Sequence, residues 1–311
     1  MNIVFLDRAT IGVSVREPKF PHTYKEYQET SADEVVERLA NAEVAIINKV
    51  PMRAPNLEKL PRLKLIAVAA TGTDCVDKTY CKAHGITVSN IRNYAVNTVP
   101  EHTLALIFAL RRSLVPYVLD VRRGKWQTIN QFCYFDHPIR DITGSTLGLI
   151  GYGALGKSVG AHAAAFGMKV ITTDVFDFPG KVDLDTILAQ SDIVSLHCPL
   201  TDGTRNMIGA AEFKKMKKDA ILINTARGGL VDEKALVEAL KNGEIAGAGF
   251  DVLSVEPPKN GNVLLDANLP NLIVTPHVAW ASIEAMTALA NQLVDNIEAW
   301  VAGKPQNVVL E

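Results

Sequence analysis

The sequence has few cysteines, no long hydrophobic run and almost no net charge, and each absence removes a class of protein. The four cysteines form no Cys-x-x-Cys pair and no metal-ligand spacing, so neither a disulfide scaffold nor a metal site is expected. No segment approaches the roughly 20 uninterrupted apolar residues of a membrane-spanning helix. The formal charge of −2 gives no reason to expect nucleic acid or an anionic membrane as a partner. We therefore expect a cytoplasmic globular protein with free thiols.

The chain is longer than one ordinary hydrophobic core requires. Its 311 residues predict two domains. The first residues, MNIVFLDR, are too weakly apolar for a secretion signal and are typical of a β-strand. Further strand-like runs near 44–48, 63–70 and 86–90 alternate with helical stretches. This alternation predicts a small parallel α/β unit at the start of the chain.

The remaining sequence predicts a second α/β unit between two helices. The first helix is expected from Thr98 to about Arg123, with Thr98 and Glu101 as a capping box and Pro100 in its first turn. A second alternating series covers 147–275, and a final helix covers 283–302, followed by NVVL (307–310). Because that last piece is too short for a domain, we expect a discontinuous domain at 1–98 and 285–311. The inserted domain is then 99–284.

Polar residues repeatedly follow the predicted strands of the inserted domain. In a parallel sheet all carboxyl ends point to one edge, where the ligand crevice lies. A single polar residue there would mean little, but several in succession indicate a site. The residues are Asp174, His197, Arg227, Asp251 and His277.

A glycine-rich segment opens this series and indicates a dinucleotide site. Gly151 permits a tight turn, Gly153 lets the backbone approach a pyrophosphate, and Gly156 lets the helix pack on the strand. Glycines at this spacing could also form an ordinary turn. Here a strand precedes them, the helical run ALGKSVGAHAAAF follows them, and Asp174 comes 18 residues after Gly156. The helix N-terminus would then hold the pyrophosphate.

Asp174 indicates which dinucleotide is bound. A carboxylate after the second strand accepts hydrogen bonds from the adenosine ribose and repels a 2′-phosphate. No Arg or Lys occurs in Val175–Gly180 to compensate. The sequence therefore predicts NAD rather than NADP, the alternative being that Asp174 is a solvated loop acid.

Two of these polar residues, together with Glu256, suit chemistry on a carbonyl or an alcohol. The planar guanidinium of Arg227 can bind a carboxylate and a carbonyl in fixed geometry. His277 can transfer a proton near neutral pH, and Glu256 can pair with it and hold its tautomer. Each also has an ordinary interpretation, as a surface arginine, a loop acid or a turn histidine. Their joint occurrence beside a dinucleotide motif favours catalysis.

At these motifs the chain resembles the D-isomer-specific 2-hydroxyacid dehydrogenases, over nearly its whole length. The resemblance is carried by GLIGYGALGKSVG (148–160), HCPLTDGTRNMI (197–208), INTARGGLVDEKAL (223–236), GAGFDVLSVEPP (247–258) and TPHVAW (275–280). It implies that Arg227 binds the substrate, that Glu256 is the acid partner and that His277 transfers the proton. The cofactor contacts that the motifs and the resemblance indicate are Thr98, Gly151, Gly153, Leu155, Gly156, Asp174, Cys198, Thr204, Thr225 and Asp251.

The resemblance also implies a fold, a partner and a carboxylate site. The fold is α/β, with two doubly wound parallel-sheet domains: an NAD-binding Rossmann domain inserted into a flavodoxin-like substrate-binding domain. Family members are usually homodimers. The loop of Thr71 and Gly72 would offer backbone N–H groups to the substrate carboxylate, the alternative being an ordinary glycine turn.

The substrate is expected to be a small 2-oxo or 2-hydroxy acid. The segment HVAWAS (277–282) and the overall length look most like glycerate dehydrogenases, also called hydroxypyruvate reductases. D-lactate and 3-phosphoglycerate dehydrogenases are the nearest alternatives, although no basic cluster for a phosphate stands out. A different class also resembles this chain, the NAD-sensing transcriptional corepressors. Those usually carry longer flexible termini.

Overall fold

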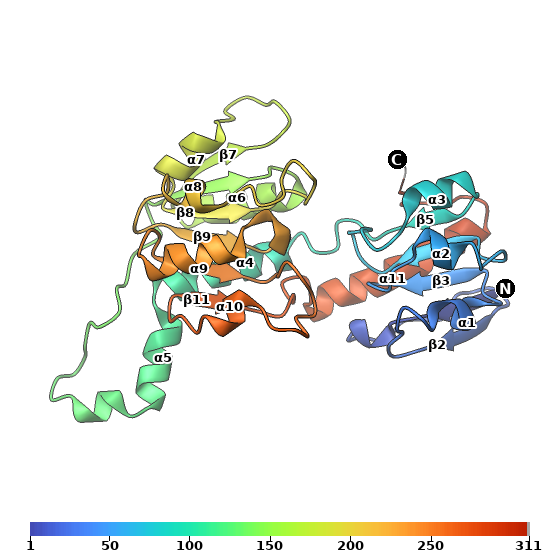
Figure 1. Cartoon of the computed structure of the whole chain (residues 1–311), viewed down its shortest axis with the longest axis horizontal. Coiled ribbons are helices and arrows are strands. Elements are labelled where there is room, and N and C mark those ends of the chain that lie inside the picture. The colour runs from blue at the N-terminus through green and yellow to red at the C-terminus, as the bar shows by residue number, and fades with distance from the viewer. Residues whose placement is uncertain (310–311) are drawn as a thin grey trace. The chain divides into compact units, whose positions relative to one another are not determined.

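Two parallel β-sheets organise the chain, one in each of two units (Figure 1). The computed structural model describes residues 1–309, so the segment NVVL (307–310) lies partly outside the described residues. Unit 1 contains Met1–Ala95 and the chain from Ala281 onward, and unit 2 contains Val96–Trp280.

Unit 1 is a five-stranded sheet in the order β2-β1-β3-β4-β5, and every pairing is parallel. This is the flavodoxin-like order. Its strands are β1 (Asn2–Phe5), β2 (Thr23–Glu26), β3 (Val44–Ile47), β4 (Leu65–Val68) and β5 (Thr87–Ser89). Its α-helices are α1 (Val35–Leu39), α2 (Ala54–Leu57), α3 (Lys78–Ala83) and α11 (Ile283–Val301), with a 3₁₀ turn at Arg8–Thr10.

The last helix of the chain belongs to unit 1 because its apolar face fits that sheet. Leu289, Leu293 and Ile297 recur every four residues along α11 and are fully buried. Among them, the amide of Asn296 donates to the carbonyl of Asn90 at 2.9 Å. The helix therefore closes the core of a unit whose strands lie some 200 residues earlier in the sequence.

Unit 2 is a six-stranded sheet in the order β11-β10-β9-β8-β6-β7, again entirely parallel. A parallel bridge from Thr172 to Lys181 extends the β7 edge. Its strands are β6 (Thr146–Ile150), β7 (Lys169–Thr173), β8 (Ile193–Leu196), β9 (Ile221–Asn224), β10 (Gly247–Phe250) and β11 (Leu272–Val274). The helices are α4 (Thr98–Arg111), α5 (Leu114–Arg122), α6 (Ala154–Ala165), α7 (Leu184–Gln190), α8 (Ala210–Phe213), α9 (Glu233–Lys241) and α10 (Val263–Asp266), with 3₁₀ turns at Lys125–Thr128 and Gly228–Leu230.

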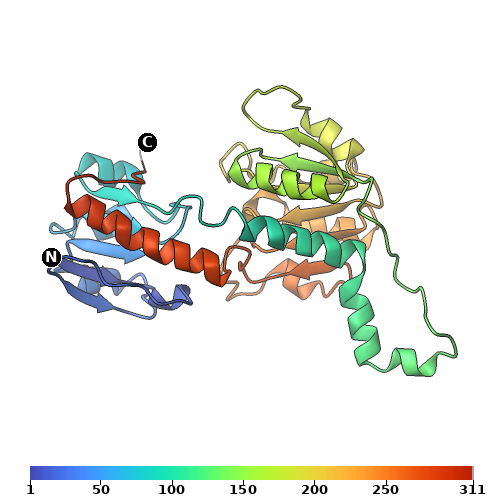
Figure 2. The ribbon, with the colours of Figure 1, turned by 180° about the vertical axis from the view of Figure 1, so that it is seen from behind.

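Helices cover both faces of this sheet, as the near-continuous apolar strands require. Helices α7, α8, α9 and α10 cover the face seen in Figure 1, and α4 and α6 cover the face seen in Figure 2. Each side encloses its own core, with Phe213 and Phe250 on the first and Ile107 and Val159 on the second. The strand order reverses at β6, which places a switch point at the carboxyl ends of β6 and β8.

The predicted fold class, two doubly wound parallel-sheet domains, is confirmed. The predicted single helix from Thr98 to Arg123 is wrong, because it breaks into α4 and α5 at Ser113, whose φ is +48°. Pro116 explains the break: it lacks an N–H, and its ring would clash with the carbonyl four residues earlier in a continuous helix. The same proline is tolerated in the first turn of α5.

Candidate functional site

The glycine-rich segment lies at the switch point of the unit 2 sheet. At two of its positions no residue other than glycine fits. Gly151 has a φ of +97°, and a Cβ on it would lie 2.5 Å from the backbone nitrogen of Cys198. A Cβ on Gly156 would lie 2.2 Å from the carbonyl oxygen of Gly151. Gly153, by contrast, faces open space and precedes the first residue of α6. The loop therefore leaves room for a pyrophosphate beside the N–H groups that begin α6.

Asp174 lies beside this loop and is held in a fixed orientation. It follows β7, and its carboxylate accepts the N–H of Tyr152 at 2.6 Å and the N–H of Val175 at 2.7 Å. Oδ1 also accepts the N–H of Phe176 at 3.4 Å, whereas Oδ2, which accepts Tyr152 alone among these groups, keeps a lone pair for a ligand hydroxyl. The residues of this edge of the sheet fit an NAD molecule, with the pyrophosphate at α6 and the ribose at Asp174.

Replacing Asp174 with alanine is expected to lower kcat/KM with NADH about 10- to 100-fold while changing kcat/KM with NADPH little, because a charge-assisted hydrogen-bond acceptor is lost. Steady-state kinetics with both cofactors measures the ratio. Asp177→Ala, at a 99% exposed carboxylate in the same loop, is the matched control. Equal use of NADH and NADPH by the unmodified protein would contradict the role given to Asp174.

Two other predicted cofactor residues lie in the loop after β8. Burial raises the pKa of the Cys198 thiol to about 11, so it stays protonated and uncharged near neutral pH. The hydroxyl of Thr204 donates to the carbonyl of Pro199 at 2.7 Å and accepts the N–H of Thr201 at 2.8 Å. These bonds shape the loop. Contacts of Cys198, Thr204 and Leu155 with NAD remain predictions.

His197, at the carboxyl end of β8, is a neutral group behind the glycine-rich loop. Burial lowers the pKa of its imidazole to about 4, and its Nε2 lies 2.9 Å from the hydroxyl of Ser195. Its Cβ lies 3.7 Å from the position that a Cβ on Gly156 would take. Of the five strand-end residues, this one serves packing.

His197 also predicts how stability depends on pH. The pKa of this histidine falls from about 6.5 to about 4 on folding. Its contribution to the free energy of unfolding is therefore complete above about pH 6.5 and is lost as the pH falls towards 4. Between about pH 7.5 and about pH 5.5 the unmodified protein should therefore lose about 1 kcal/mol more unfolding free energy than His197→Gln. Urea unfolding at both pH values measures this difference. His162→Gln, at an exposed histidine of α6, should behave as the unmodified protein does, and parallel losses in all three would disprove the effect.

The histidine and the acid predicted to act together are in contact. Nδ1 of His277 lies 2.6 Å from Oε2 of Glu256, whose Oε1 accepts the N–H of Leu253 at 2.7 Å. Because an ionised carboxylate only accepts, Nδ1 carries the proton of this bond. Nε2 is then the ring atom that can exchange a proton with a substrate.

Arg227 belongs to a loop that packs against the segment leading to Glu256. Asn224, at the end of β9, donates its side-chain amide to the carbonyl of Arg227 at 2.9 Å. A Cβ on the next residue, Gly228, would lie 1.9 Å from the carbonyl carbon of Leu253, so the two loops touch there and only glycine fits. The structure thus brings the Arg227 and Glu256 loops to the same edge of the sheet.

Helix α4 supports two of these loops, and it corrects one prediction. The capping box at Thr98 is wrong, because the helix is preceded by Asn97 without a side-chain cap. The hydroxyl of Thr98 instead donates to the carbonyl of Ala279 at 3.0 Å. This carbonyl is within reach because α4 begins beside the loop that contains Ala279. Thr103 in the same helix lies within 3.1 Å of the hydroxyl of Thr225. NAD contacts of Thr98 and Thr225 remain predictions.

Asp251 is buried and holds the segment that carries His277. It is 1% exposed, and its carboxylate accepts the N–H groups of Val278 and Ala279 at 2.9 and 2.8 Å. Both carboxylate oxygens of Asp251 therefore accept hydrogen bonds from this loop. The contact of Asp251 with the cofactor that the sequence indicated remains a prediction. His102 was not among the predicted site residues, although its Nε2 lies 3.0 Å from the hydroxyl of Thr275. The one feature of the sequence that pointed to it is its position one helical turn after Thr98.

Thr71 and Gly72 belong to unit 1 and follow β4. The hydroxyl of Thr71 donates to the carbonyl of Ile91 at 2.7 Å, and the amide of Asn90 donates to the carbonyl of Thr71 at 2.8 Å. These bonds fix the loop within its unit. The contact of this loop with a substrate carboxylate remains a prediction.

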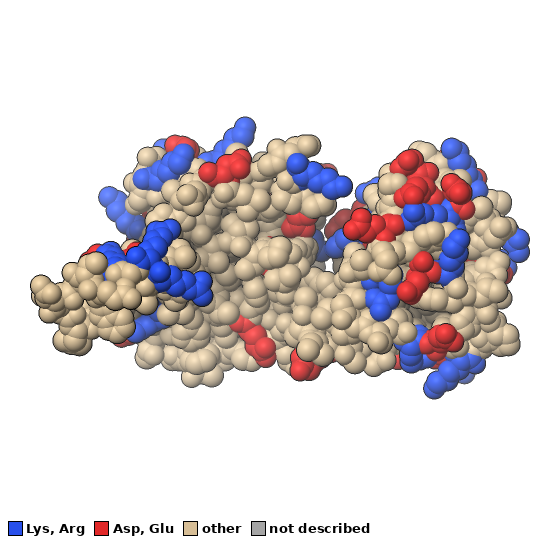
Figure 3. All heavy atoms as spheres, turned by 90° about the horizontal axis from the view of Figure 1, so that it is seen from below, with Lys and Arg blue, Asp and Glu red and all other residues tan. Residues whose placement is uncertain are grey.

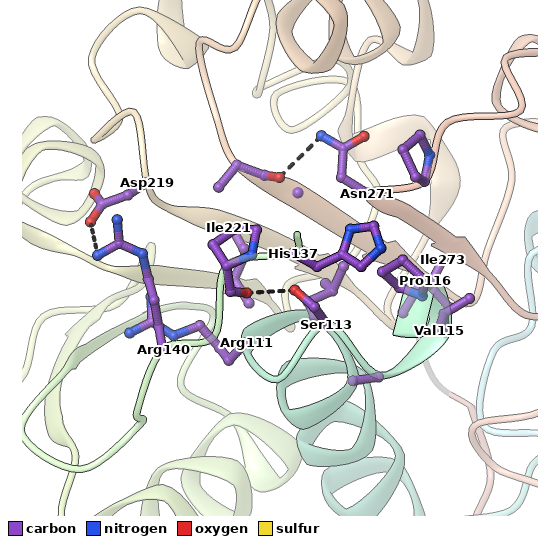
Figure 4. Close-up of a pocket in the computed structure, with 16 residues that line it drawn as sticks. Arg111, Ser113, Val115, Pro116, His137, Arg140, Asp219, Ile221, Asn271 and Ile273 are labelled. Carbon is purple, nitrogen blue, oxygen red and sulfur yellow. Dashed lines mark hydrogen bonds and ion pairs between the residues drawn. The ribbon is translucent and has the colours of Figure 1, made fainter. Parts of the chain in front are cut away.

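Unit 2 has one cavity at each of the two edges where its strands begin and end. A cavity of about 320 Å³ is lined by His277, Glu256 and Asp251, at the carboxyl ends of the strands. Another, of about 280 Å³, includes Ile221 and Gly247, the first residues of β9 and β10, and thus lies at the opposite edge (Figure 4). Of the five polar strand-end residues, Asp251 and His277 line the first cavity. Among residues 1–309 there is no cluster of three potential metal ligands, and no helix is long and apolar enough to span a membrane.

Comparisons with known proteins agree with this geometry. Residues 104–279 match the family model described as D-isomer specific 2-hydroxyacid dehydrogenase, NAD binding domain. The chain is 68% identical to a glycerate dehydrogenase of Methylorubrum extorquens, covering 99% of this chain and 98% of the relative. It is 38% identical to a hydroxypyruvate reductase of Blautia hydrogenotrophica, covering 90% and 88%. A D-lactate dehydrogenase with NAD⁺ from Lactobacillus jensenii is similar in structure, with a TM-score of 0.81, 29% identity and full coverage of both chains.

Proposed function

The chain belongs to the D-isomer-specific 2-hydroxyacid dehydrogenases and is an NAD-dependent oxidoreductase, and we propose that it interconverts hydroxypyruvate and D-glycerate. The observation that carries the substrate is the 68% identity to a glycerate dehydrogenase over nearly the full length of both chains. The observation that carries the chemistry is the 2.6 Å contact between His277 and Glu256 beside the dinucleotide edge.

In this proposal, unit 2 binds NAD and unit 1 contributes to the substrate site. NAD supplies the carrier that accepts or delivers a hydride at the substrate C2. Arg227 binds the substrate carboxylate and polarises the carbonyl, and the backbone N–H groups of Thr71 and Gly72 hold the same carboxylate. In reduction, His277 donates its Nε2 proton to the carbonyl oxygen; in oxidation, it takes this proton back. Glu256 orients the ring and stabilises the imidazolium.

A steady-state assay with NADH tests this function directly. Hydroxypyruvate, glyoxylate, pyruvate and phosphohydroxypyruvate are compared by kcat/KM, and the product is resolved by chiral chromatography. Hydroxypyruvate should exceed pyruvate, because a site that hydrogen-bonds a substrate hydroxyl discriminates against an analogue that lacks it. D-glycerate should be the only enantiomer formed. A preference for pyruvate or phosphohydroxypyruvate would move the protein to the D-lactate or 3-phosphoglycerate alternative. If the protein reduced none of these oxo acids, that result would support the corepressor alternative. The similarity to a glycerate dehydrogenase and a hydroxypyruvate reductase argues against that alternative.

We also place the protein in the cytoplasm. The four cysteines are free thiols, as a reducing compartment maintains them. Fractionation of cells that produce the protein, with disulfide-bonded and cytoplasmic marker proteins followed in parallel, tests this placement.

A homodimer is proposed from an apolar arm of unit 2, residues 114–140. The arm extends away from the sheet of its own unit (Figures 1 and 2), and its outer end in Figure 3 consists mostly of uncharged side chains. Phe132 and Phe135 are 89% and 83% exposed, and Trp126 is half exposed. Burying one such aromatic side chain contributes about 1.5–3 kcal/mol of favourable free energy relative to leaving it exposed to water. An exposed group of such side chains therefore indicates an interaction surface. A second copy of the chain could cover them.

Light scattering during size-exclusion chromatography tests the homodimer. The unmodified protein should have twice the mass of one chain, and the double variant Phe132→Ser, Phe135→Ser should shift towards monomer. Phe166→Ser, at a phenylalanine of unit 2 outside the arm, is the control and should stay dimeric. An unmodified protein with the mass of a single chain would refute this assignment.

A further inference from the structure

Helix α4 contacts the loop that carries His277 at two points, from residues four apart on one face. The hydroxyl of Thr98 donates to the carbonyl of Ala279 at 3.0 Å. One turn later, Nε2 of His102 lies 3.0 Å from the hydroxyl oxygen of Thr275. The two contacts hold the loop 275–279 on either side of His277.

The proton positions in the second contact follow from the groups present. The Thr275 hydroxyl lies 2.5 Å from Oδ1 of Asp251, and its single proton goes to that carboxylate. Its lone pair therefore accepts the Nε2–H of His102. The same Nε2 lies 3.6 Å from Oδ1 of Asp251. Helix, threonine and buried carboxylate thus form one connected chain of hydrogen bonds.

This chain ends on the backbone of the catalytic histidine. The N–H of His277 donates to the carbonyl of Asp251 at 2.8 Å. His277 has a φ of +56°, a left-handed conformation that costs a residue with a side chain about 1–3 kcal/mol unless its surroundings impose it. The bonds from Asp251 and Thr275 are what impose it here.

We propose that His102 is a positioning residue for His277. Its Nε2–H orients Thr275, Thr275 and Asp251 fix the loop 275–279, and the fixed loop keeps the imidazole of His277 on Glu256. His102 itself contacts neither substrate nor NAD in this role. The inference rests on the proposed catalytic function of His277, and it adds a residue of α4 to the machinery of that site.

Paired substitutions separate the hydrogen bond from the bulk of the side chain. His102→Leu removes the donor, whereas His102→Gln keeps an N–H donor at similar reach. Thr275→Val removes the hydroxyl with little change of shape, and Thr275→Ser keeps it. The Leu and Val variants should lose about tenfold in kcat, with KM for hydroxypyruvate and the NADH dissociation constant within about twofold. The Gln and Ser variants should recover most of kcat.

Trp280 supplies a readout that does not depend on turnover. Its indole N–H donates to the carbonyl of His277 at 2.9 Å, so its environment reports the position of this loop. In a Trp126→Phe, Trp300→Phe background it is the only tryptophan left of the three. His102→Leu should change its emission maximum and increase its quenching by acrylamide, whereas His102→Gln and the control His162→Leu should not.

The outcomes are distinct. His102→Leu with an unchanged Trp280 signal and unchanged kcat overturns the proposal, and so do equal losses in the Leu and Gln variants. If His102→Leu does not fold, Thr275→Val against Thr275→Ser decides by the same two readouts. If the unmodified protein turns over no 2-oxo acid, the proposed function fails, while the Trp280 comparison still decides whether His102 holds the loop.

Discussion

Replacing His277 with alanine is expected to lower kcat about 10²- to 10⁴-fold in both directions of the reaction, while the affinity for NADH stays the same. The imidazole pairs with Glu256 at 2.6 Å through Nδ1, which leaves Nε2 to donate the proton in reduction and accept it in oxidation. Alanine offers no group for either step. The glycine-rich loop and Asp174, which are predicted to bind NAD, lie on other segments of the sheet edge and are left intact.

Turnover in both directions and NADH binding by fluorescence titration check this expectation. His162→Ala, at an exposed histidine of the same unit, is the matched control and should retain full activity. A His277→Ala enzyme within about tenfold of the unmodified protein would remove His277 from proton transfer.

Replacing Arg227 with glutamine is expected to lower kcat/KM about 10²- to 10³-fold, through both a lower kcat and a higher substrate KM. In the proposed mechanism the guanidinium holds the substrate carboxylate and polarises its carbonyl; in the structure its Nη1 donates to the carbonyl of Ala226 at 2.8 Å. Its loop is fixed by Asn224 and by the close packing of Gly228 on Leu253, so the change should affect the charge rather than the backbone.

Arg227→Lys distinguishes charge from shape, because lysine keeps the charge but not the planar fork. It should recover part of the loss, mainly in KM. Arg205→Gln removes an exposed arginine of the same unit and should leave both constants unchanged. An Arg227→Gln enzyme within about threefold of the unmodified protein would show that Arg227 does not bind the oxo acid.

The sequence predicted the carboxyl edge of the unit 2 sheet because that edge depends on local pattern. Asp174, His197, Arg227, Asp251 and His277 each follow an apolar strand, and all six strands are parallel as expected. In a parallel sheet, chain order alone places strand ends together. The contact of His277 with Glu256 then follows from two loops at neighbouring strand ends.

Features that depend on tertiary contacts escaped prediction. Strand β2, with the sequence TYKE, is a mostly exposed edge strand and shows no apolar run. The break at Ser113 did have a local signal in Pro116, but the carbonyl of Pro138 that accepts the Ser113 hydroxyl lies 25 residues further along the chain. Thr98 gave a capping-box pattern, but a loop 181 residues away takes its hydroxyl instead. No short-range pattern contains these partners.

The two-part sequence of unit 1 constrains the order in which the chain folds during synthesis. Strands β1–β5 leave the ribosome before unit 2, but α11, which brings Leu289, Leu293 and Ile297 to their core, leaves after it. Unit 2 is continuous from Val96 to Trp280 and can complete its core before α11 exists. The unit 1 sheet is therefore expected to keep an uncovered apolar face until α11 has been synthesised. We therefore expect chaperones to bind a nascent chain of this protein mainly at the unit 1 sheet.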